Sequence, residues 1–334
     1  MSNPSNAPAE KPLKTAFTEQ FQVKYPIVCA PMFLVSTIKL VVAAGEAGGI
    51  GTFPALNYRP VERYHEAIRE IKSLTDKPFG INIIVQQSNK YQHKQLEYAL
   101  EEKTPLIITS LGKPRETIQL AHQAGSKVYC DVINLDHAKK VADLGADGLI
   151  AVGSGAGGHA GDISPFALIP SLVQEIGLPV LAAGSIVDGR GMAAAFALGA
   201  AGVYLGTRFI ASAEAEVDQA YKDAIIGARS EDIVNTHRVD GFPGNFINNP
   251  ALQQVGLKDG IFETLASRSK RIKRWIALSR AARSLLAKPT HKISYKTVYS
   301  AGHSAGLIRD VQTVPEIMEH MIREYRAIVG KMPS

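Results

Sequence analysis

The sequence has few of the residues that cross-link a chain or anchor it in a membrane. Its 334 residues include two cysteines, Cys29 and Cys130, and a single tryptophan. Each cysteine lies within a short apolar run, so we expect two buried free thiols in a reducing compartment and exclude a disulfide framework. No apolar run approaches the roughly 18 residues that a membrane-spanning helix requires. The sequence therefore predicts a cytoplasmic protein that does not enter a membrane.

Charge of one sign is not concentrated in this chain. The formal net charge of +6 is a mild basic excess, which tolerates acidic or phosphorylated partners but does not indicate nucleic-acid binding. No two histidines have the spacing of metal ligands, so no catalytic metal is expected. Residues 1–14 are polar, contain prolines and lack the apolar segment of a signal peptide. We predict that they form a disordered tail.

What the sequence does contain is a regular alternation of strand-like and helix-like segments. Apolar spacing predicts helices at 38–47, 60–74, 135–144, 166–176 and 190–198. Short apolar runs predict eight strands, at 27–30, 49–52, 79–84, 106–109, 127–131, 148–152, 180–183 and 202–205. This alternation favours an α/β protein with a closed TIM (β/α)8 barrel. A doubly wound sheet is the alternative that the pattern leaves open.

The alternation stops after Thr207. Residues 210–290 read as helix-rich and polar, interrupted by the loop DGFPGNFINNP, and the chain ends in a predicted strand, YKTVYS, and a helix that begins PEIMEHMIREY. We expect a barrel built from residues 15–209 and 291–334, with a C-terminal helical lid insertion at 210–290. The final helix is expected to close the barrel.

Several strands are followed by residues that suit a cofactor site. The functional loops of a barrel follow the carboxyl ends of its strands, and the loops after strands seven and eight commonly bind phosphate. The phrases AAGS and LGTR occupy those two positions, and APM and GIN stand at the first and third strands. This arrangement predicts a flat phosphorylated cofactor. The residues concerned are Pro31, Met32, Asn82, Gly184, Ser185, Gly206 and Thr207.

The loop GSGAGGHAG, residues 153–161, directly follows the sixth strand. Its glycines allow a close approach to the backbone, and its histidine titrates near neutral pH. His159 has only Gly158 and Ala160 beside it, so we expect it to be accessible and to act as a proton acceptor. Other histidines, including His65, His93 and His137, lie on helical or polar segments and are predicted to be solvated.

Two further motif matches are discounted. Residues 153–158 spell GxGxxG, but no amphipathic helix begins there, as a dinucleotide-binding fold would require. Residues 302–306 spell GHSAG, a match to the nucleophile elbow of serine hydrolases. Only Asp310 and His320 follow it as triad partners, and both are too close in sequence to converge on Ser304.

The quoted phrases together resemble the nitronate monooxygenase family. The resemblance rests on PIVCAPM, AGEAGGIGT, PFGIN, GAGGH, LAAGSIVDGRGMAAAFALGAAGVYLGTRF and SAGHSAGLI, and it covers most of residues 20–325. Related enzymes include flavin-dependent enoyl-ACP reductases and NAD(P)H:quinone reductases. The resemblance implies an FMN-binding TIM barrel and is compatible with a homodimer.

Carried over residue by residue, the resemblance implies roles for the candidate site. Pro31, Met32 and Asn82 would lie beside the flavin, and His159 would be the active-site base. Electrons would pass one at a time from an alkyl nitronate through a flavin semiquinone to O2. The glycine loop would edge the ring, and the last two strands would cradle the phosphate, which assigns cofactor contacts to Ala156, Gly157, Gly158, Gly184, Ser185, Gly206 and Thr207.

The chain also departs from the family pattern. Many members have glutamate at position 155, glycine at 185 and glutamine at 303, where this chain has Gly155, Ser185 and His303. Asp131, at the end of the fifth strand, places a carboxylate near the expected cofactor. Such a charge does not suit an anionic nitronate, so the substrate stays open.

Three functions remain after these departures. The first is a nitronate monooxygenase, which needs no nicotinamide. The second is an NAD(P)H-dependent enoyl-ACP or quinone reductase, and the basic run at 268–274 would suit docking of an acidic carrier protein in the enoyl-ACP case. The third is a barrel that isomerises a sugar phosphate without redox chemistry.

Overall fold

Eight parallel strands form a closed barrel in the computed structural model, which describes residues 11–256 and 297–332. The N-terminal tail up to residue 10 and the basic run at 268–274 lie outside the described residues. The strand order is β1-β2-β3-β4-β5-β6-β8-β9, so each strand pairs with its neighbour in the barrel sequence and β9 pairs with β1. The predicted TIM barrel is confirmed. The strands are β1 (Ile27–Cys29), β2 (Ile50–Pro54), β3 (Phe79–Ile84), β4 (Leu106–Ser110), β5 (Lys127–Val132), β6 (Gly148–Val152), β8 (Val180–Ala183) and β9 (Gly202–Leu205).

The two faces of the strands build two different cores, because successive side chains point to opposite sides of a strand. One face packs against the surrounding helices, and both cysteines lie in this outer core as buried free thiols. The other face fills the barrel and packs against Phe17 and Phe21 of helix α1 (Ala16–Phe21). The Phe17 ring meets Tyr129 edge to face at 5.9 Å. Helix α1 therefore closes the amino-terminal end of the barrel and leaves the carboxyl end for the site.

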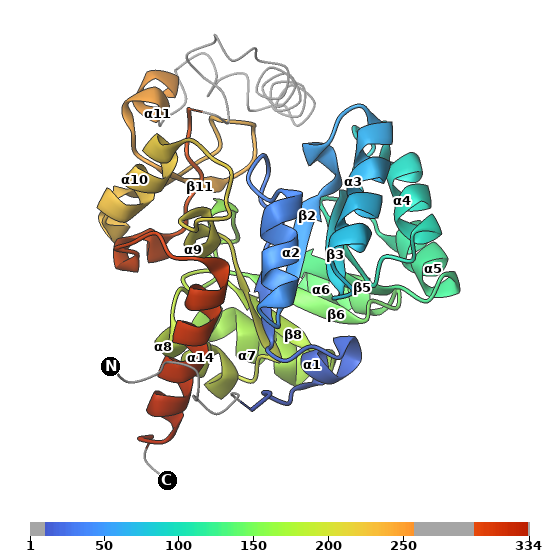
Figure 1. Cartoon of the computed structure of the whole chain (residues 1–334), viewed down its shortest axis with the longest axis horizontal. Coiled ribbons are helices and arrows are strands. Elements are labelled where there is room, and N and C mark those ends of the chain that lie inside the picture. The colour runs from blue at the N-terminus through green and yellow to red at the C-terminus, as the bar shows by residue number, and fades with distance from the viewer. Residues whose placement is uncertain (1–10, 257–296, 333–334) are drawn as a thin grey trace, which may run out of the picture.

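A ring of helices surrounds the strands, as Figure 1 shows. Helix α14 (Val314–Val329) packs between α8 and α2 and completes the ring, so the expected closing helix is confirmed. A capping box at Thr313 and Glu316 begins it. The other barrel helices are α2 (Ile38–Glu46), α3 (Val61–Leu74), α4 (Gln92–Glu101), α5 (Arg115–Gln123), α6 (Leu135–Ala142), α7 (Pro165–Ile176) and α8 (Gly189–Ala197). None of the described helices is long and apolar enough to cross a membrane.

The expectation for residues 210–290 was wrong in one respect, because their described part contains strands as well as helices. After α9 (Thr207–Ile210) and α10 (Gln219–Gly227), the chain forms β10 (Ile233–Thr236) and β11 (Gly244–Ile247). Strand β11 lies within the supposed loop DGFPGNFINNP and pairs on its other edge with β7 (Gly158–His159). All four residues at 244–247 are buried, so the sequence there lacks the alternation of apolar and polar residues that would indicate a strand. Helix α11 (Pro250–Val255) follows.

The predicted strand YKTVYS is also corrected. Within its described part, residues 297–300, only an isolated bridge joins Ser300 to Phe246. Val298 is buried against Phe246 and Leu252. The apolar spacing reflects this small cluster at the edge of the three-stranded sheet. No barrel strand is formed there.

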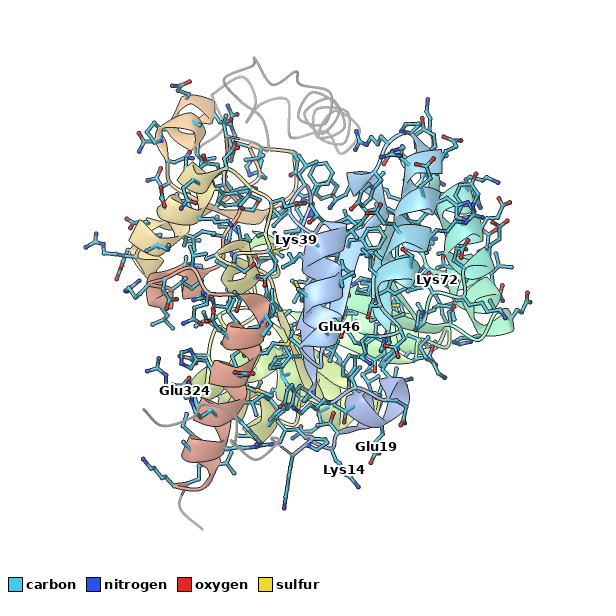
Figure 2. All side chains as sticks on the ribbon, viewed as in Figure 1. Lys14, Glu19, Lys39, Glu46, Lys72 and Glu324 are labelled. Atoms are coloured by element: carbon cyan, nitrogen blue, oxygen red, sulfur yellow. The ribbon has the colours of Figure 1, made fainter. Side chains whose placement is uncertain are left out.

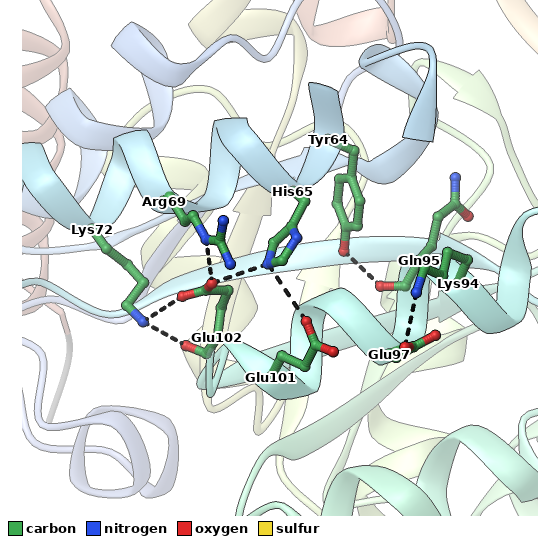
Figure 3. Close-up of polar contacts among 9 residues, drawn as sticks. All are labelled: Tyr64, His65, Arg69, Lys72, Lys94, Gln95, Glu97, Glu101 and Glu102. Atoms are coloured by element: carbon green, nitrogen blue, oxygen red, sulfur yellow. Dashed lines mark hydrogen bonds and ion pairs between the residues drawn. The ribbon is translucent and has the colours of Figure 1, made fainter. Parts of the chain in front are cut away.

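Most charged side chains lie on the outer surface, and Figure 2 labels six of them on α1, α2, α3, α14 and the segment before α1. One cluster joins two helices (Figure 3). Glu102, just after α4, accepts hydrogen bonds from His65 at 3.0 Å, Arg69 at 2.8 Å and Lys72 at 2.9 Å, all from α3. His65 also stacks on Tyr98 at 4.0 Å. The prediction that His65 is solvated was wrong, because its side chain is only 12% exposed.

We predict that Glu102→Gln lowers the free energy of unfolding at pH 7 by about 1 kcal/mol, since its cationic partners are largely exposed and screened. The cationic partners lower the pKa of Glu102 to about 2. The stabilisation is therefore complete above the unfolded value near 4.5 and is lost as the pH falls toward 2. Urea unfolding at pH 7 and pH 3 should show a smaller difference between variant and wild type at pH 3. The matched control is Glu101→Gln, whose side chain is half exposed. An equal loss in that control would contradict the assignment to Glu102.

Candidate functional site

The loop after β6 is pressed against two other backbone segments at the carboxyl end of the barrel. A Cβ added at Gly157 would lie 2.7 Å from the amide nitrogen of Gly302, and one added at Gly302 would lie 2.4 Å from the carbonyl oxygen of Gly155. A Cβ at Gly155 would lie 1.8 Å from Ser185 Oγ. Contacts this short exclude any larger residue without movement of the backbone or of Ser185. The loop therefore needs glycine at positions 155 and 157, because the neighbouring segments leave no room for a side chain there.

Asn245 of β11 holds this loop in place. Its side chain is 1% exposed, and its Nδ2 donates to the carbonyl oxygens of Ser154 at 2.8 Å and Ala156 at 2.7 Å. Its Oδ1 accepts a hydrogen bond from Asn235 at 3.0 Å. Sequence reasoning missed Asn245 because the contact joins residues about ninety positions apart. The pattern DGFPGNFINNP carried no signal of it.

His159 is held by the segment that connects β10 to β11. Its Nε2 lies 2.6 Å from Oδ2 of Asp240, whose side chain is 7% exposed, whereas the His159 side chain is 42% exposed. The other carboxylate oxygen of Asp240 accepts a hydrogen bond from the amide of Phe242 at 3.0 Å. The Phe242 ring meets the imidazole edge to face at 5.5 Å. The expectation of an accessible histidine therefore holds, but its buried carboxylate partner was not foreseen.

Three neighbouring strands contribute a line of polar side chains inside the barrel mouth. Asn82 Nδ2 of β3 donates to Ser110 Oγ of β4 at 2.6 Å, and Ser110 Oγ donates to Asp131 Oδ2 of β5 at 2.5 Å. The other oxygen of Asp131, Oδ1, is shielded from solvent and has no hydrogen-bond partner among the described residues. Burial raises the pKa of Asp131 to about 6, although the Ser110 hydrogen bond and nearby His159 oppose this.

The predicted phosphate loops come together on the other side of the mouth. Ser185 adopts a left-handed φ of 58° and reaches Gly155, while Thr207 Oγ1 accepts a hydrogen bond from the amide of Gly302 at 2.9 Å. Gly184 has a φ of 113°, and a Cβ there would meet the amide of Ala156 at 3.0 Å. The backbone amides of Gly184, Ser185, Gly206 and Thr207 donate to no other group in the described part of the chain. They are therefore available to an anion.

The loop after β1 lies next to these residues. Met32 sulfur would lie 3.6 Å from a Cβ added at Gly206. Asn57 fixes the turn, accepting from the amide of Leu34 at 2.9 Å and donating to the carbonyl of Met32 at 3.2 Å. Pro31 and Met32 are half-buried. Both thus lie at the rim of the barrel where the sequence placed them.

The two discounted motifs are also accounted for. The GxGxxG match at 153–158 leads into β7 and follows a strand of a closed barrel, so it does not open a dinucleotide-binding helix. Ser304 is buried in a short 3-10 helix. Asp310 pairs with Arg208 at 3.1 Å, and His320 lies 3.4 Å from Gln312. These side chains therefore form no hydrolase triad.

A TIM barrel with an accessible histidine over a glycine loop and free amides after its last two strands has the features of a flavin-dependent oxidoreductase. The chain belongs to the nitronate monooxygenase family, whose model matches residues 14–324. This match confirms the resemblance found in the sequence.

Three of the similar proteins cover most of this chain. A Rhodococcus jostii protein named (3aS,4S,5R,7aS)-5-hydroxy-7a-methyl-1-oxo-octahydro-1H-indene-4-carboxyl-CoA dehydrogenase is 35% identical over 77% of this chain and 73% of its own. The structure of FabK from Thermotoga maritima has a TM-score of 0.82 and 32% identity over 96% of this chain and 98% of that one. A probable nitronate monooxygenase of Staphylococcus aureus is 28% identical over 74% of this chain and 82% of its own.

Two departures from the family pattern are connected in space. The sequence resemblance implies glutamate at position 155 and glycine at position 185, where this chain has Gly155 and Ser185. The hydroxyl of Ser185 occupies the place that any side chain at 155 would need. The residue that fits at position 155 therefore depends on the residue at position 185. This dependence cannot be seen when each position of the sequence is considered separately.

We predict that Gly155→Ala lowers the free energy of unfolding by about 1–3 kcal/mol, since overpacking a tight contact has this cost. In a Ser185→Gly background the added methyl group has room, and the loss should fall below about 0.5 kcal/mol. Urea unfolding of the four proteins in this cycle measures the coupling. Gly227→Ala is the control, because a Cβ there meets nothing within 4 Å. An equal loss in both backgrounds would exclude Ser185 as the cause.

Proposed function

We propose that the chain binds FMN across the mouth of the barrel and acts as an FMN-dependent oxidoreductase. The residues present fit the cofactor. Four unengaged backbone amides at positions 184, 185, 206 and 207 suit a phosphate group, and the Thr207 hydroxyl keeps its own hydrogen for donation because it only accepts from Gly302. FMN, when bound, supplies the electron acceptor or donor that the protein side chains lack.

The flavin ring would be held by the opposite part of the mouth. Met32 and Asn82 line the ends of β1 and β3, and the exposed backbone of Gly157 lies across from them in the loop after β6. Bare backbone there lets a flat ring approach closely. These are the residues for which the family resemblance implies flavin contacts, and their functional roles are part of this proposal.

His159 is proposed as the group that moves a proton. With Asp240 ionised, the carboxylate only accepts hydrogen bonds, so the hydrogen between them belongs to Nε2 of the imidazole. Nδ1 is then the nitrogen whose lone pair can take a proton from a substrate carbon or return one to it. Asp240 and Phe242 limit rotation of the ring, which makes Asp240 a positioning residue.

We infer that the substrate is an acyl thioester of coenzyme A or a carrier protein, oxidised or reduced next to its carbonyl group. The supporting structural observation is an apolar rim formed by the loops after β5 and β6 and the start of α7, where Ile133, Ile163 and Phe166 are 44%, 38% and 69% exposed. An acyl chain can cover such side chains. The relatives at 32–35% identity, a CoA dehydrogenase and FabK, support the same class.

A nitronate monooxygenase is the second candidate. It is favoured by the family model and by the pairing of His159 with Asp240, since a base of this kind also suits deprotonation of a nitroalkane. A nitroalkane oxidase from Streptomyces ansochromogenes is similar in structure, with a TM-score of 0.79 and 25% identity. The expected use of O2 belongs to this candidate.

We expect purified protein to be yellow and its flavin to be bleached anaerobically by NADH, NADPH or a saturated acyl-CoA. An absorbance spectrum recorded after each addition checks this, with an alkyl nitronate as the competing addition. Bleaching by the nitronate alone would reject the thioester proposal in favour of the monooxygenase. Protein that takes up no FMN would reject both.

We further predict that Asp240→Asn lowers kcat about 10- to 100-fold while KM and FMN content stay within about threefold, because the imidazole loses the charge that fixes its tautomer. Steady-state kinetics with the substrate found above measures both constants. Asp162→Asn, at an exposed carboxylate three residues after His159, is the control. A loss of FMN in Asp240→Asn would instead indicate a structural role.

A further inference from the structure

The negative charge at the floor of the barrel mouth is not neutralised by the described residues. Asp131 lies on the inner face of β5, and its carboxylate receives one hydrogen bond, from the uncharged Ser110. No lysine or arginine in the described ranges forms an ion pair with it. His159 exerts an electrostatic influence that favours the charged form of Asp131, but its Nε2 already contacts Asp240 at 2.6 Å.

The groups that face Asp131 come from four elements. Asn82 and Ser110 are neutral side chains of β3 and β4, and Tyr204 on the inner face of β9 is a buried phenol whose pKa is raised by burial and then by Asp131. The adjoining strand β6 adds only apolar residues, Ile150 and Val152. Cys130 faces the outer core and has its pKa raised chiefly by burial. Of the described groups around Asp131, Ser110 and His159 favour its charged form.

We propose that Asp131 is a specificity-determining residue, whose carboxylate at the floor of the site rejects substrates that arrive as anions and admits neutral ones. The inference rests on the proposed function and deepens it, because an acyl thioester is neutral at its reacting carbon whereas a nitronate is an anion. Repulsion between two like charges is strong where the surroundings are poor in water. The Ser110 and Asn82 hydrogen bonds hold the carboxylate in this position.

The charge is conditional on pH. Burial raises the pKa of Asp131 to about 6, so the group carries its charge at pH 8 and has largely lost it at pH 5.5. The Ser110 hydrogen bond acts in the opposite direction and favours the charged form. Discrimination against anions should therefore weaken as the pH falls, and removal of the Ser110 hydroxyl should move this change to higher pH.

The test measures binding of a redox-inert pair of molecules that differ in charge and little in shape, butyrate and butyramide, to the FMN-loaded protein. Perturbation of the flavin absorbance gives each dissociation constant. At pH 8, Asp131→Asn should tighten butyrate binding on the order of tenfold and leave butyramide within about twofold. At pH 5.5, Asp131→Asn and the wild type should bind butyrate with nearly the same affinity.

Two further variants keep the test decisive. Ser110→Ala retains the carboxylate but lacks the hydrogen bond that favours its charged form. As the pH falls, its butyrate affinity should therefore reach that of Asp131→Asn at a higher pH than the wild-type affinity does. Asp136→Asn changes the same charge at an exposed position on α6 and should behave as wild type. Equal butyrate binding by wild type and Asp131→Asn at pH 8, with FMN retained, overturns the inference alone. Failure of the wild type to hold FMN overturns the proposed function and this inference with it.

Discussion

The candidate site depends on one constraint, the close packing of three backbone segments at the carboxyl end of the barrel. Residues 153–159 can lie against residues 301–303 and against Ser185 only because Gly155, Gly157 and Gly302 have no side chains. Such a loop would be conformationally free on its own, since glycine loses more backbone entropy on ordering than other residues. The two hydrogen bonds from buried Asn245 and the pairing of β7 with β11 fix it. The orientation of His159 depends on Asp240, which lies in the turn between β10 and β11.

The carboxylates of Asp240 and Asp131, both at the mouth of the barrel, differ in how well the protein compensates their charge. Asp240 has its charge paired with His159 and hydrogen-bonded to a backbone amide. Asp131 has one oxygen without a partner in the described structure, and the pKa near 6 means that the folded state binds a proton more tightly than the unfolded chain does. Stability therefore falls as the pH rises from about 4 to about 6, by at most about 3 kcal/mol. A group that destabilises the fold in its charged form is more readily explained by the chemistry of the mouth than by packing.

The sequence was most informative where local pattern and architecture coincide. All eight barrel strands were placed within two residues at either end, because buried parallel strands are short apolar runs and the helices between them keep a regular spacing. The rim positions of Met32, Asn82, Ser185, Thr207 and His159 followed from that alternation alone. Strand β11 with its Asn245, and Asp240 in the turn before this strand, were missed. Their partners lie 81 to 91 positions away along the chain, and no periodicity reports a contact of that kind.

The departures from the family pattern become coherent once they are placed in three dimensions. The family resemblance implies an acidic side chain at position 155, on the loop beside the proposed phosphate site, where Ser185 leaves no room for one in this chain. An acidic side chain is present here on the other side of the mouth, at Asp131, where it is reached through Ser110 and Asn82. Moving negative charge away from the phosphate loops lowers repulsion toward a cofactor phosphate, and placing it on the floor raises repulsion toward an anionic substrate. Both features therefore support the proposed function, in which the chain binds a phosphorylated flavin and acts on a neutral substrate.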